Sequence, residues 1–418
     1  MREMKDSGIV WVGAMPQAWG MNTVAQIFLQ VKCKNTGLQE KNLLSLSYGK
    51  VKRKSIDTVE GLLPESFDGY NIIEKDDIVL RLTDLQNDHT SLRVGLAEER
   101  GIITSAYLTI RNRSNFCPRY LYYYLHSFDI AKGFYGMGAG VRQGLNWDGV
   151  KWLKILAPSV PEQERIAAFL DAECAEIDAV LEKTRASIEE YKKLKQAVIT
   201  QAVTKGVRGD RPMKDSGIEW IGDIPAEWDV IRVKQLLKER NERSKEGKEE
   251  PLSMSQKVGL VPTKFLESIP NMASSFVGAK LAYVDDLVFN KLKAHLGVFS
   301  VSRYDGLVSP DYAVYCSTGK SNLKYLEYIF KTPQCIGEFR KKSTGIAAGL
   351  MRLYTEGLFS IYLPYPALSE QEEIAEYLNE KCAGIDALIV KKQQYLTEIE
   401  NYKKSLIYEY VTGKKEVV

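Results

Sequence analysis

The sequence EQERIAAFLDAECAEIDAVLEK, residues 162–183, returns as EQEEIAEYLNEKCAGIDALIVK at residues 370–391, an offset of 208. A second pair of segments lies upstream. MKDSGIVWVGAMPQAW at 4–19 matches MKDSGIEWIGDIPAEW at 213–228, with 10 of 16 positions identical at an offset of 209. Two long matches at nearly the same offset are not a chance event. The chain is therefore an internal duplication.

The repeated segments at 162–183 and 370–391 predict two long helices. In each copy, apolar or small residues recur at alternating steps of four and three residues over five heptads, the pattern of a coiled-coil seam. Pro161 suits the first turn of the first helix, and a capping box from Ser369 to Glu372 is expected to open the second. About 42 residues at about 1.5 Å each make a rod of roughly 60 Å, and we expect the helices to pair antiparallel as a spacer. The spacer seam includes Leu170, Ile177, Leu181, Ile188, Leu378, Ile385, Ile389 and Leu396.

Two lysines, Lys195 and Lys403, interrupt the seam at equivalent positions. A lysine at such a position either extends to solvent, fixes the register or faces a partner protein, and the sequence leaves these alternatives open. The tryptophans at positions 11, 19, 220 and 228 recur at the same spacing in both copies and are expected to pack against the helices.

Between the repeated segments lie two stretches, about 20–157 and 229–363, that have diverged on a shared framework of short strands and one aromatic-rich helix each. Gly101 and Gly306 are expected at hairpin turns. The pattern predicts one α/β (α+β) domain used twice: two tandem globular domains joined by the two helices. The expected divisions are 1–157 for the N-terminal segment and first domain, 158–212 for the first helix and linker, 213–363 for the second segment and domain, and 364–418 for the second helix.

Composition is that of a folded protein, with 44% hydrophobic and 27% charged residues and a net charge of +3. No apolar run approaches a membrane span, and the N-terminus, MREMKDSG, lacks the apolar core of a secretory signal. The six cysteines form no C-x-x-C pair, which favours reduced thiols in a cytoplasmic protein. With three histidines, no recognisable metal site is expected.

No catalytic centre is expected in this chain. A DNA methyltransferase needs an Asn/Asp-Pro-Pro-aromatic motif, and the sequence contains no Pro-Pro pair. The segment Ser317 to Ser321 lacks the first glycine of a phosphate-binding loop. The acidic residues of the long helices occupy expected solvent faces.

The whole chain resembles a known family. The opening M-K-D-S-G-I-x-W-x-G-x-x-P-x-x-W, its second copy, and the P-x-x-E-Q-x-x-I-A helix starts look like the specificity subunit of type I restriction–modification enzymes. The resemblance implies two target-recognition domains that read the halves of a split, asymmetric site in double-stranded DNA. It also implies two bound modification subunits that methylate adenine with S-adenosylmethionine, and restriction subunits that translocate DNA with ATP and Mg²⁺. The chain itself would need no cofactor.

Candidate DNA-contacting residues are long polar or cationic side chains on expected loops, because such groups bind phosphates and base edges. In the first domain the basic loop after Leu46 suits a backbone clamp, and the glycine-rich loop 138–144 carries an Arg-Gln pair suited to guanine and adenine. The first-domain set is Tyr48, Lys50, Lys52, Arg53, Lys54, Arg81, Asn87, His89, Arg142 and Gln143.

The second domain departs from this pattern, because Ala347 and Ala348 stand where Arg142 and Gln143 stand in the first. Residues that flank its glycine-rich loop are expected to take over. The second-domain set is Ser255, Gln256, Lys257, Asn290, Lys291, Lys293, His295, Lys341, Lys342, Ser343, Thr344 and Arg352.

Two other functions fit the same architecture: a two-headed protein-interaction adaptor, and a tandem-domain repressor without partner enzymes. Neighbouring genes for a methyltransferase and a helicase-nuclease would favour the recognition subunit over both.

Overall fold

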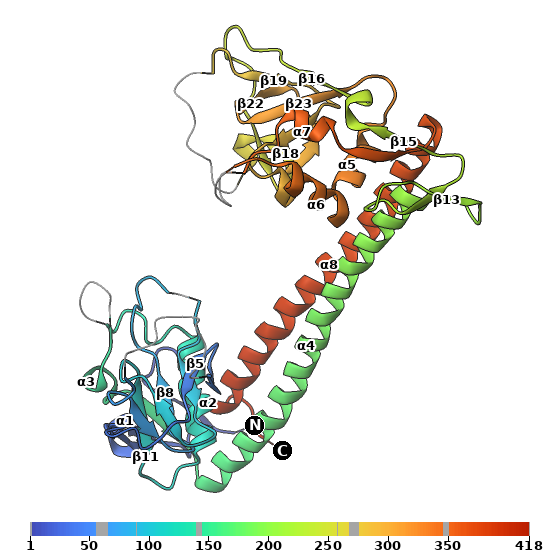
Figure 1. Ribbon diagram of the computed structural model, residues 1–418. Helices are drawn as coiled ribbons and strands as arrows, with labels where there is room; N and C mark the ends of the chain where they lie inside the picture. Colours follow the sequence, from blue (N-terminus) through green and yellow to red (C-terminus); the bar gives the residue numbers. More distant parts are fainter. Residues whose placement is uncertain are drawn as a thin grey trace. The chain divides into compact units, whose positions relative to one another are not determined.

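The computed structural model describes residues 2–55, 66–88, 90–138, 144–256, 258–266, 276–345 and 351–417. The chain divides into two compact units. Unit 1 comprises Met1–Arg185 and Gln394–Val418, and unit 2 comprises Ala186–Gln393 (Figure 1). Each unit is a mixture of strands and helices and is described by itself.

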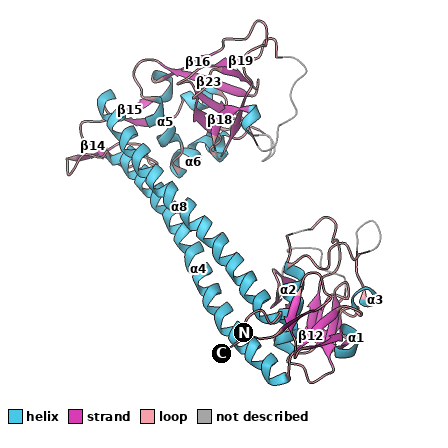
Figure 2. Ribbon diagram, turned by 180° about the vertical axis from the view of Figure 1, so that it is seen from behind, coloured by secondary structure: helices cyan, strands magenta, loops and turns pink. Residues whose placement is uncertain are grey.

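Unit 1 is built on an antiparallel four-stranded sheet of order β4-β11-β8-β9. All three residues of β8 are buried, because β8 lies inside the sheet with both faces covered. Helix α2 (Pro118–Ile130) packs against β9. Figure 2 shows α2 beside the strands of unit 1. The strands of this sheet are β4 (Phe28–Gln30), β8 (Ile78–Leu80), β9 (Val94–Leu96) and β11 (Leu108–Asn112).

Short elements complete unit 1. Strands β5 (Leu44–Ser47) and β6 (Lys50–Arg53) form a hairpin that contacts β9. The other pairs are β1 (Met4–Asp6) with β2 (Ala14–Pro16), β3 (Gly20–Thr23) with β12 (Lys154–Ala157), and β7 (Asn71–Ile73) with β10 (Gly101–Ile103); the short helices are α1 (Val24–Ile27) and α3 (Trp147–Val150).

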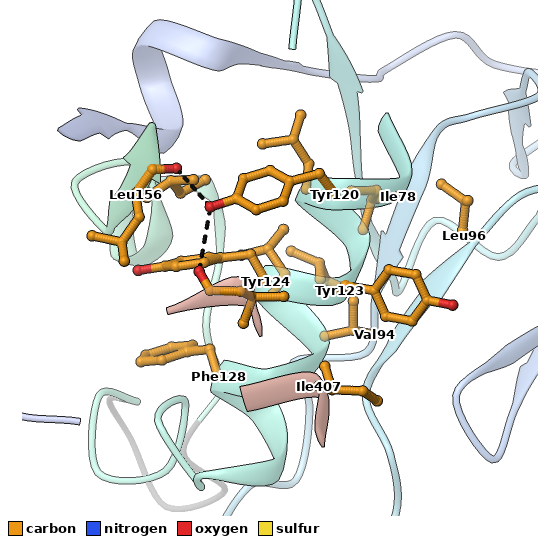
Figure 3. Packing of buried hydrophobic residues seen from close by; sticks show 14 of the residues in the cluster. Ile78, Val94, Leu96, Tyr120, Tyr123, Tyr124, Phe128, Leu156 and Ile407 are labelled. Atoms are coloured by element: carbon orange, nitrogen blue, oxygen red, sulfur yellow. Dashed lines mark hydrogen bonds between the residues drawn. The ribbon is translucent and has the colours of Figure 1, made fainter. Parts of the chain in front are cut away.

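The core of unit 1 joins α2 to the sheet and to the long helices (Figure 3). Tyr120 is fully buried, and its hydroxyl donates hydrogen bonds to the carbonyls of Leu156, at 3.1 Å, and Val411, at 3.4 Å. Ile407 belongs to the same cluster. The aromatic helix therefore contributes to the core, as its sequence pattern allowed, instead of presenting its rings to solvent.

Unit 2 repeats this plan with a four-stranded sheet of order β16-β23-β20-β21. Helices α5 (Leu323–Phe330) and α6 (Pro333–Lys342) belong to its core, and β17 (Leu252–Ser255) with β18 (Gly259–Pro262) forms the equivalent hairpin. The sheet strands are β16 (Leu237–Arg240), β20 (Leu287–Asn290), β21 (Phe299–Val301) and β23 (Tyr312–Ser317).

The remaining strand pairs of unit 2 follow those of unit 1. The strand pairs are β13 (Met213–Asp215) with β14 (Asp223–Pro225), β15 (Asp229–Arg232) with β24 (Tyr362–Tyr365), and β19 (Lys280–Ala282) with β22 (Gly306–Val308). The short helices are η1 (Val233–Gln235), η2 (Thr263–Phe265), η3 (Ala294–Leu296) and α7 (Thr355–Phe359). The predicted fold class, with mixed helix and strand in two domains and two long helices, is confirmed.

The long helices are α4 (Val160–Lys205) and α8 (Leu368–Val411). They run antiparallel in unit 1, where the Phe169 ring packs against the Tyr410 ring with centroids 4.4 Å apart and an interplanar angle of 41°, and Arg185 pairs with Glu400 at 2.8 Å. They run antiparallel in unit 2 as well, where Arg208 pairs with Glu373 at 2.8 Å. All eight predicted seam residues lie in these helices and are buried or half-buried.

The two seam lysines pair across the helices in the same way in each unit. In unit 1 the Lys403 ammonium lies 2.6 Å from the carboxylate of Asp178, and in unit 2 Lys195 lies 2.6 Å from Asp386. Both members of each pair are separated from their counterparts by 208 positions. Of the three alternatives, the geometry therefore favours a register-fixing ion pair.

The same tryptophan–glutamate hydrogen bond occurs in both units, between residues of the repeated segments. The Trp19 indole donates to Glu162 at 3.1 Å, and the Trp228 indole donates to Glu370 at 3.0 Å. The expected packing of these tryptophans on the long helices is confirmed.

Two local expectations were wrong. Helix α8 begins at Leu368, and the amide of Glu370 donates to the carbonyl of Ala367 at 2.9 Å, so Ser369 lies inside the first turn and cannot cap it. Gly101 and Gly306 begin strands β10 and β22, which pair with β7 and β19 and not with the strands just before them. These glycines lie at crossovers between sheets, where the close approach of Asn42 and Glu250 carbonyls leaves no room for a Cβ.

Candidate nucleic-acid interface

Three separate segments of unit 1 meet at one place, which we call edge 1. They are the turn at Tyr48 and Gly49, the loop between β8 and β9 (described over residues 81–88 and 90–93), and the segment 144–145 before α3. A Cβ at Gly49 would lie 3.1 Å from Leu92, so the turn touches the loop that joins β8 to β9. The amide of Leu145 donates to the carbonyl of Leu82 at 2.8 Å. Edge 1 thus gathers first-domain candidates that are far apart in sequence.

The turn of the β5–β6 hairpin places an aromatic side chain in solvent. Tyr48 and Gly49 have φ values of +48° and +75°, the left-handed pair of a tight hairpin turn. The Tyr48 side chain is 87% exposed. An exposed ring at the tip of a basic hairpin is suited to contact a nucleic-acid surface.

The basic residues that follow this turn differ in how strongly they are held. Lys50, Lys52 and Lys54 are exposed, although the Lys50 ammonium lies 3.4 Å from Asp178. Arg53 makes a two-pronged contact with Glu99, which lowers the pKa of that carboxyl. Lys50 and Lys52 are therefore better placed than Arg53 to meet phosphates.

The loop 81–88 holds two of the predicted residues. The Arg81 guanidinium is 36% exposed and lies 3.9 Å from the Asp88 carboxylate. The Asn87 amide donates to Asp84 at 2.8 Å. Ser91 and Thr90 donate to Asp88 and hold its pKa well below the ordinary value. Three other candidates of the first domain, His89, Arg142 and Gln143, and Lys257 of the second lie outside the described residues.

Unit 2 brings together the equivalent segments at a place we call edge 2. They are the β17–β18 turn, the loop 291–298 after β20, and the stretches 343–345 and 351–353 around α6 and α7. Gln256 donates to the carbonyl of Leu296 at 3.0 Å. The amide of Leu353 donates to the carbonyl of Lys291 at 3.0 Å, and this hydrogen bond is the counterpart of the one from Leu145 to Leu82 in unit 1.

Several predicted residues of edge 2 have structural partners. The side-chain oxygen of Asn290 (Oδ1) accepts hydrogen bonds from the backbone amides of Leu292 and Lys293, so this side chain shapes the turn. Lys291 donates to the carbonyl of Pro310 at 3.3 Å, and His295 is half-buried. Lys293 is exposed, and Ser255 is half-buried.

The last group of candidates lies at the end of α6. Lys341 pairs with Glu338 at 2.7 Å, Lys342 is exposed, and Ser343 donates to the Phe339 carbonyl at 2.6 Å. Thr344 and Arg352 form a backbone bridge, and the Arg352 guanidinium lies 3.4 Å from Asp311. The structure therefore brings these residues to the loop after β20.

Two exposed apolar side chains at edge 2 were not among the residues predicted from the sequence to contact DNA. Val258, in the hairpin turn, is 61% exposed, and Leu296, whose carbonyl binds Gln256, is 49% exposed. The thymine methyl group is the apolar feature of the major groove, and side chains of this kind suit it. Sequence gave no signal for them, because single apolar residues in loops are common on any surface.

Within the described ranges, no three His, Cys, Asp or Glu side chains are grouped so as to hold a metal ion. No described helix is long and apolar enough to cross a membrane.

Comparison with known proteins links this arrangement to one group. No family model matches the chain. The MjaVIII type I restriction enzyme specificity subunit from Methanocaldococcus jannaschii is 24% identical over 283 residues, covering 63% of each chain. The EcoDI type I restriction enzyme specificity subunit from Escherichia coli is 22% identical over 290 residues, covering 63% of this chain and 62% of the relative. The matches thus span less than two thirds of either relative's length.

Solved structures extend the likeness over almost the whole chain. A structure described as the basis of complex assembly and conformational transition of the type I R-M system has a TM-score of 0.72 at 14% identity, covering 96% of this chain and 99% of that one. The HsdS subunit from Thermoanaerobacter tengcongensis has a TM-score of 0.52 at 14% identity, covering 96% and 98%.

The chain has the fold of the type I specificity subunits.

The resemblance expected from the repeated motifs is thereby confirmed.

Proposed function

We propose that this chain is the non-catalytic DNA-recognition subunit of a type I restriction–modification complex that acts in the cytoplasm. Unit 1 reads one half of a bipartite, asymmetric site in double-stranded DNA, and unit 2 reads the other. Adenine methylation and DNA cleavage are carried out by partner subunits, to which S-adenosylmethionine, ATP and Mg²⁺ belong.

One observation carries the proposal: the same three segments meet in both units, joined by the same backbone hydrogen bond, but present different side chains. Two domains that recognise different base sequences need the same backbone arrangement with different exposed side chains. Edge 1 is basic and carries Tyr48, whereas edge 2 adds the apolar Val258 and Leu296.

The lysines and the polar side chains have separate roles in this proposal. Lys50, Lys52 and Lys342 neutralise phosphates and fix the position of each unit on the duplex. Arg81, Asn87 and Gln256 stand at the loops and turn that face base edges. Contacts of the first kind supply affinity for any sequence, and contacts of the second kind select among sequences.

Exposed aromatic and aliphatic side chains on α8 support the docking of modification subunits. Unit 1 exposes Tyr395 and Tyr402, and unit 2 exposes Leu388 and Val390; each is between 44% and 56% exposed. Tyr395 and Tyr402 lie seven residues apart and therefore share one face of α8. Exposed large apolar groups on a helix are typical of protein–protein interfaces. We expect one adenine methyltransferase to dock on each unit, and restriction subunits to join this assembly.

The test is methylation in a host without adenine methylation of its own. The chain is expressed with the methyltransferase encoded beside it, and methylated adenines are mapped across the genome. We expect a split motif methylated on both strands, which disappears when this chain is omitted. Methylation that persists without the chain would refute the proposal and favour the adaptor or repressor.

A further inference from the structure

One buried arginine organises the loop of edge 1. Arg93 is completely buried, and its guanidinium donates hydrogen bonds to the backbone carbonyls of Arg81, at 3.0 Å, and Thr83, at 2.8 Å. It also reaches the carbonyls of Asp84 and Asp88. Every one of these acceptors belongs to the loop that joins β8 to β9.

Other residues hold Arg93 in turn. Its Nε donates to the Tyr135 hydroxyl at 3.0 Å, and that hydroxyl donates to the Asp88 carbonyl at 3.0 Å. The Arg93 amide donates to the Asp129 carboxylate at 2.6 Å. The guanidinium lies 5.2 Å from the centre of the Tyr135 ring. Helix α2 therefore holds the backbone of Arg93 through Asp129, and Tyr135, in the segment after α2, binds both the guanidinium and the loop.

The physical role of this contact follows from the lack of regular structure in the loop. Residues 81–88 form no strand or helix, so their carbonyls find few partners in the backbone. A planar guanidinium offers five N–H groups in a fixed fork, and one arginine can bind several carbonyls in a defined arrangement. A lysine ammonium keeps the charge but offers three donors without this fork. The conformation of the loop therefore depends on the shape of the Arg93 side chain.

Unit 2 shapes the equivalent loop by other means. Asn290 accepts from the amides of Leu292 and Lys293, the short helix η3 follows, and Gly297 closes the loop with φ of +77°. A side chain at the start of the loop and a glycine at its end replace a buried arginine. Selectivity that depends on Arg93 therefore belongs to one half of the target only.

We infer that Arg93 is a positioning residue that determines which base pairs unit 1 accepts. It touches no DNA itself. It holds Arg81 and Asn87, and the hydrogen bond between Leu82 and Leu145, in one arrangement relative to the Tyr48 turn. Because an offset of about 1 Å in a site is enough to lose a geometric match, a loosened loop accepts wrong bases in that half. The inference rests on the proposed function.

The experiment compares Arg93→Lys with wild type, each assembled with its methyltransferase subunits. The binding constant is measured for duplexes that carry the mapped target, a single mismatch in the half read by unit 1, or one in the other half. We expect the preference against mismatches in the first half to fall at least about tenfold, the scale of one bidentate base contact. The preference in the other half stays unchanged.

Two further variants separate positioning from folding. Tyr135→Phe removes one acceptor of Arg93 together with the hydrogen bond from that hydroxyl to the Asp88 carbonyl, and is expected to give a smaller loss of the same preference. Arg111→Lys is the matched control: Arg111 also forms a two-pronged contact, with Asp77 at 2.7 Å, but stands on β11 away from edge 1. We expect Arg111→Lys to lower the melting temperature and leave both preferences intact.

Each outcome bears on a different claim. Arg93→Lys with an unchanged first-half preference overturns the inference. If Arg93→Lys fails to fold, Tyr135→Phe decides: a folded variant with full preference overturns the inference, and one with reduced first-half preference supports it. A wild-type complex that binds all duplexes equally refutes the proposed function itself.

Discussion

At the scale of single residues, burial in unit 1 moves two ionisable groups in opposite directions. Burial, with a contribution from Lys403, lowers the pKa of His126 from 6.5 to about 4. Burial raises the pKa of Asp129 from 3.8 to about 6, although its hydrogen bond from Arg93 opposes the change. Both groups lie on α2, and their neutral forms fit the core.

These two groups predict opposite pH effects on stability. Below pH 6.5 the unfolded chain protonates His126 while the folded chain does not, so stability is lost as the pH falls from 6.5 to about 4. Above pH 3.8 the unfolded chain ionises Asp129 first, so stability is lost as the pH rises towards 6. Each group changes the free energy of unfolding by about 3 kcal/mol at most. In the wild type the two changes have opposite signs over this pH range and largely cancel.

Single variants should separate the two effects. Relative to wild type, His126→Gln gains stability as the pH falls from 6.5 to 4, and Asp129→Asn gains stability as the pH rises from 4 to 6. Urea unfolding at several pH values measures both differences. Curves that stay parallel to the wild-type curve would contradict the assigned burial of these groups.

Residue-level prediction from the sequence succeeded where the pattern was repeated and local. The packing of Trp19 and Trp228 and the seam positions were predicted, because periodicity and duplication report burial directly. The role of Arg93 was not predictable, since its acceptors come from a loop whose path depends on tertiary structure. Arg142, the best candidate for base contact, lies outside the described residues.

At the scale of elements, the β5–β6 hairpin carries the proposed phosphate contacts. Replacing Lys50 and Lys52 by glutamate should weaken DNA binding about equally on target and non-target duplexes, and should reduce the slope of log affinity against log salt by about 2. Titration at several salt concentrations measures this slope. The control Lys5→Glu, on β1, should leave it unchanged; an unchanged slope for the double variant would remove the hairpin from the interface.

The apolar surface of edge 2 predicts a chemical preference. If Val258 and Leu296 meet a thymine methyl, then replacing thymine by deoxyuridine in the half read by unit 2 should weaken binding, whereas Val258→Ala should bind the two duplexes alike. The same base change in the other half serves as the control. This assignment would be contradicted if wild type bound the thymine and deoxyuridine duplexes equally. It would also be contradicted if the half-site read by unit 2 specified no A·T pair.

The helix seam predicts large and local losses of stability. Leu170 and Leu378 are fully buried at equivalent positions of α4 and α8, so truncation to alanine should cost about 2–5 kcal/mol each. Removing the cross-helix ion pair by Asp178→Asn should cost about 1 kcal/mol or less, because the pair is partly exposed. Urea unfolding distinguishes the two classes, and a costly Asp178→Asn would overturn the ranking.

At the scale of the whole molecule, the duplication was the most informative feature of the sequence. Two matches at nearly one offset predicted two domains of the same plan and two long helices, and the sheets β4-β11-β8-β9 and β16-β23-β20-β21 repeat one order. The meeting of separate loops at each edge could not be predicted, because it depends on crossovers such as those at Gly101 and Gly306. The start of α4 at Pro161 was predicted, whereas the capping box at Ser369 was wrong because α8 begins one residue earlier.

The central claim is that each unit selects one half of the target. Its most direct test is a genome-wide map of methylated adenine in cells that express the methyltransferase with wild type, Arg142→Ala or Gln256→Ala. We expect Arg142→Ala to relax the motif in one half only and Gln256→Ala to relax it in the other. If both variants relax the same half, or if the motif is unchanged in each, the assignment of one reader to each unit is contradicted.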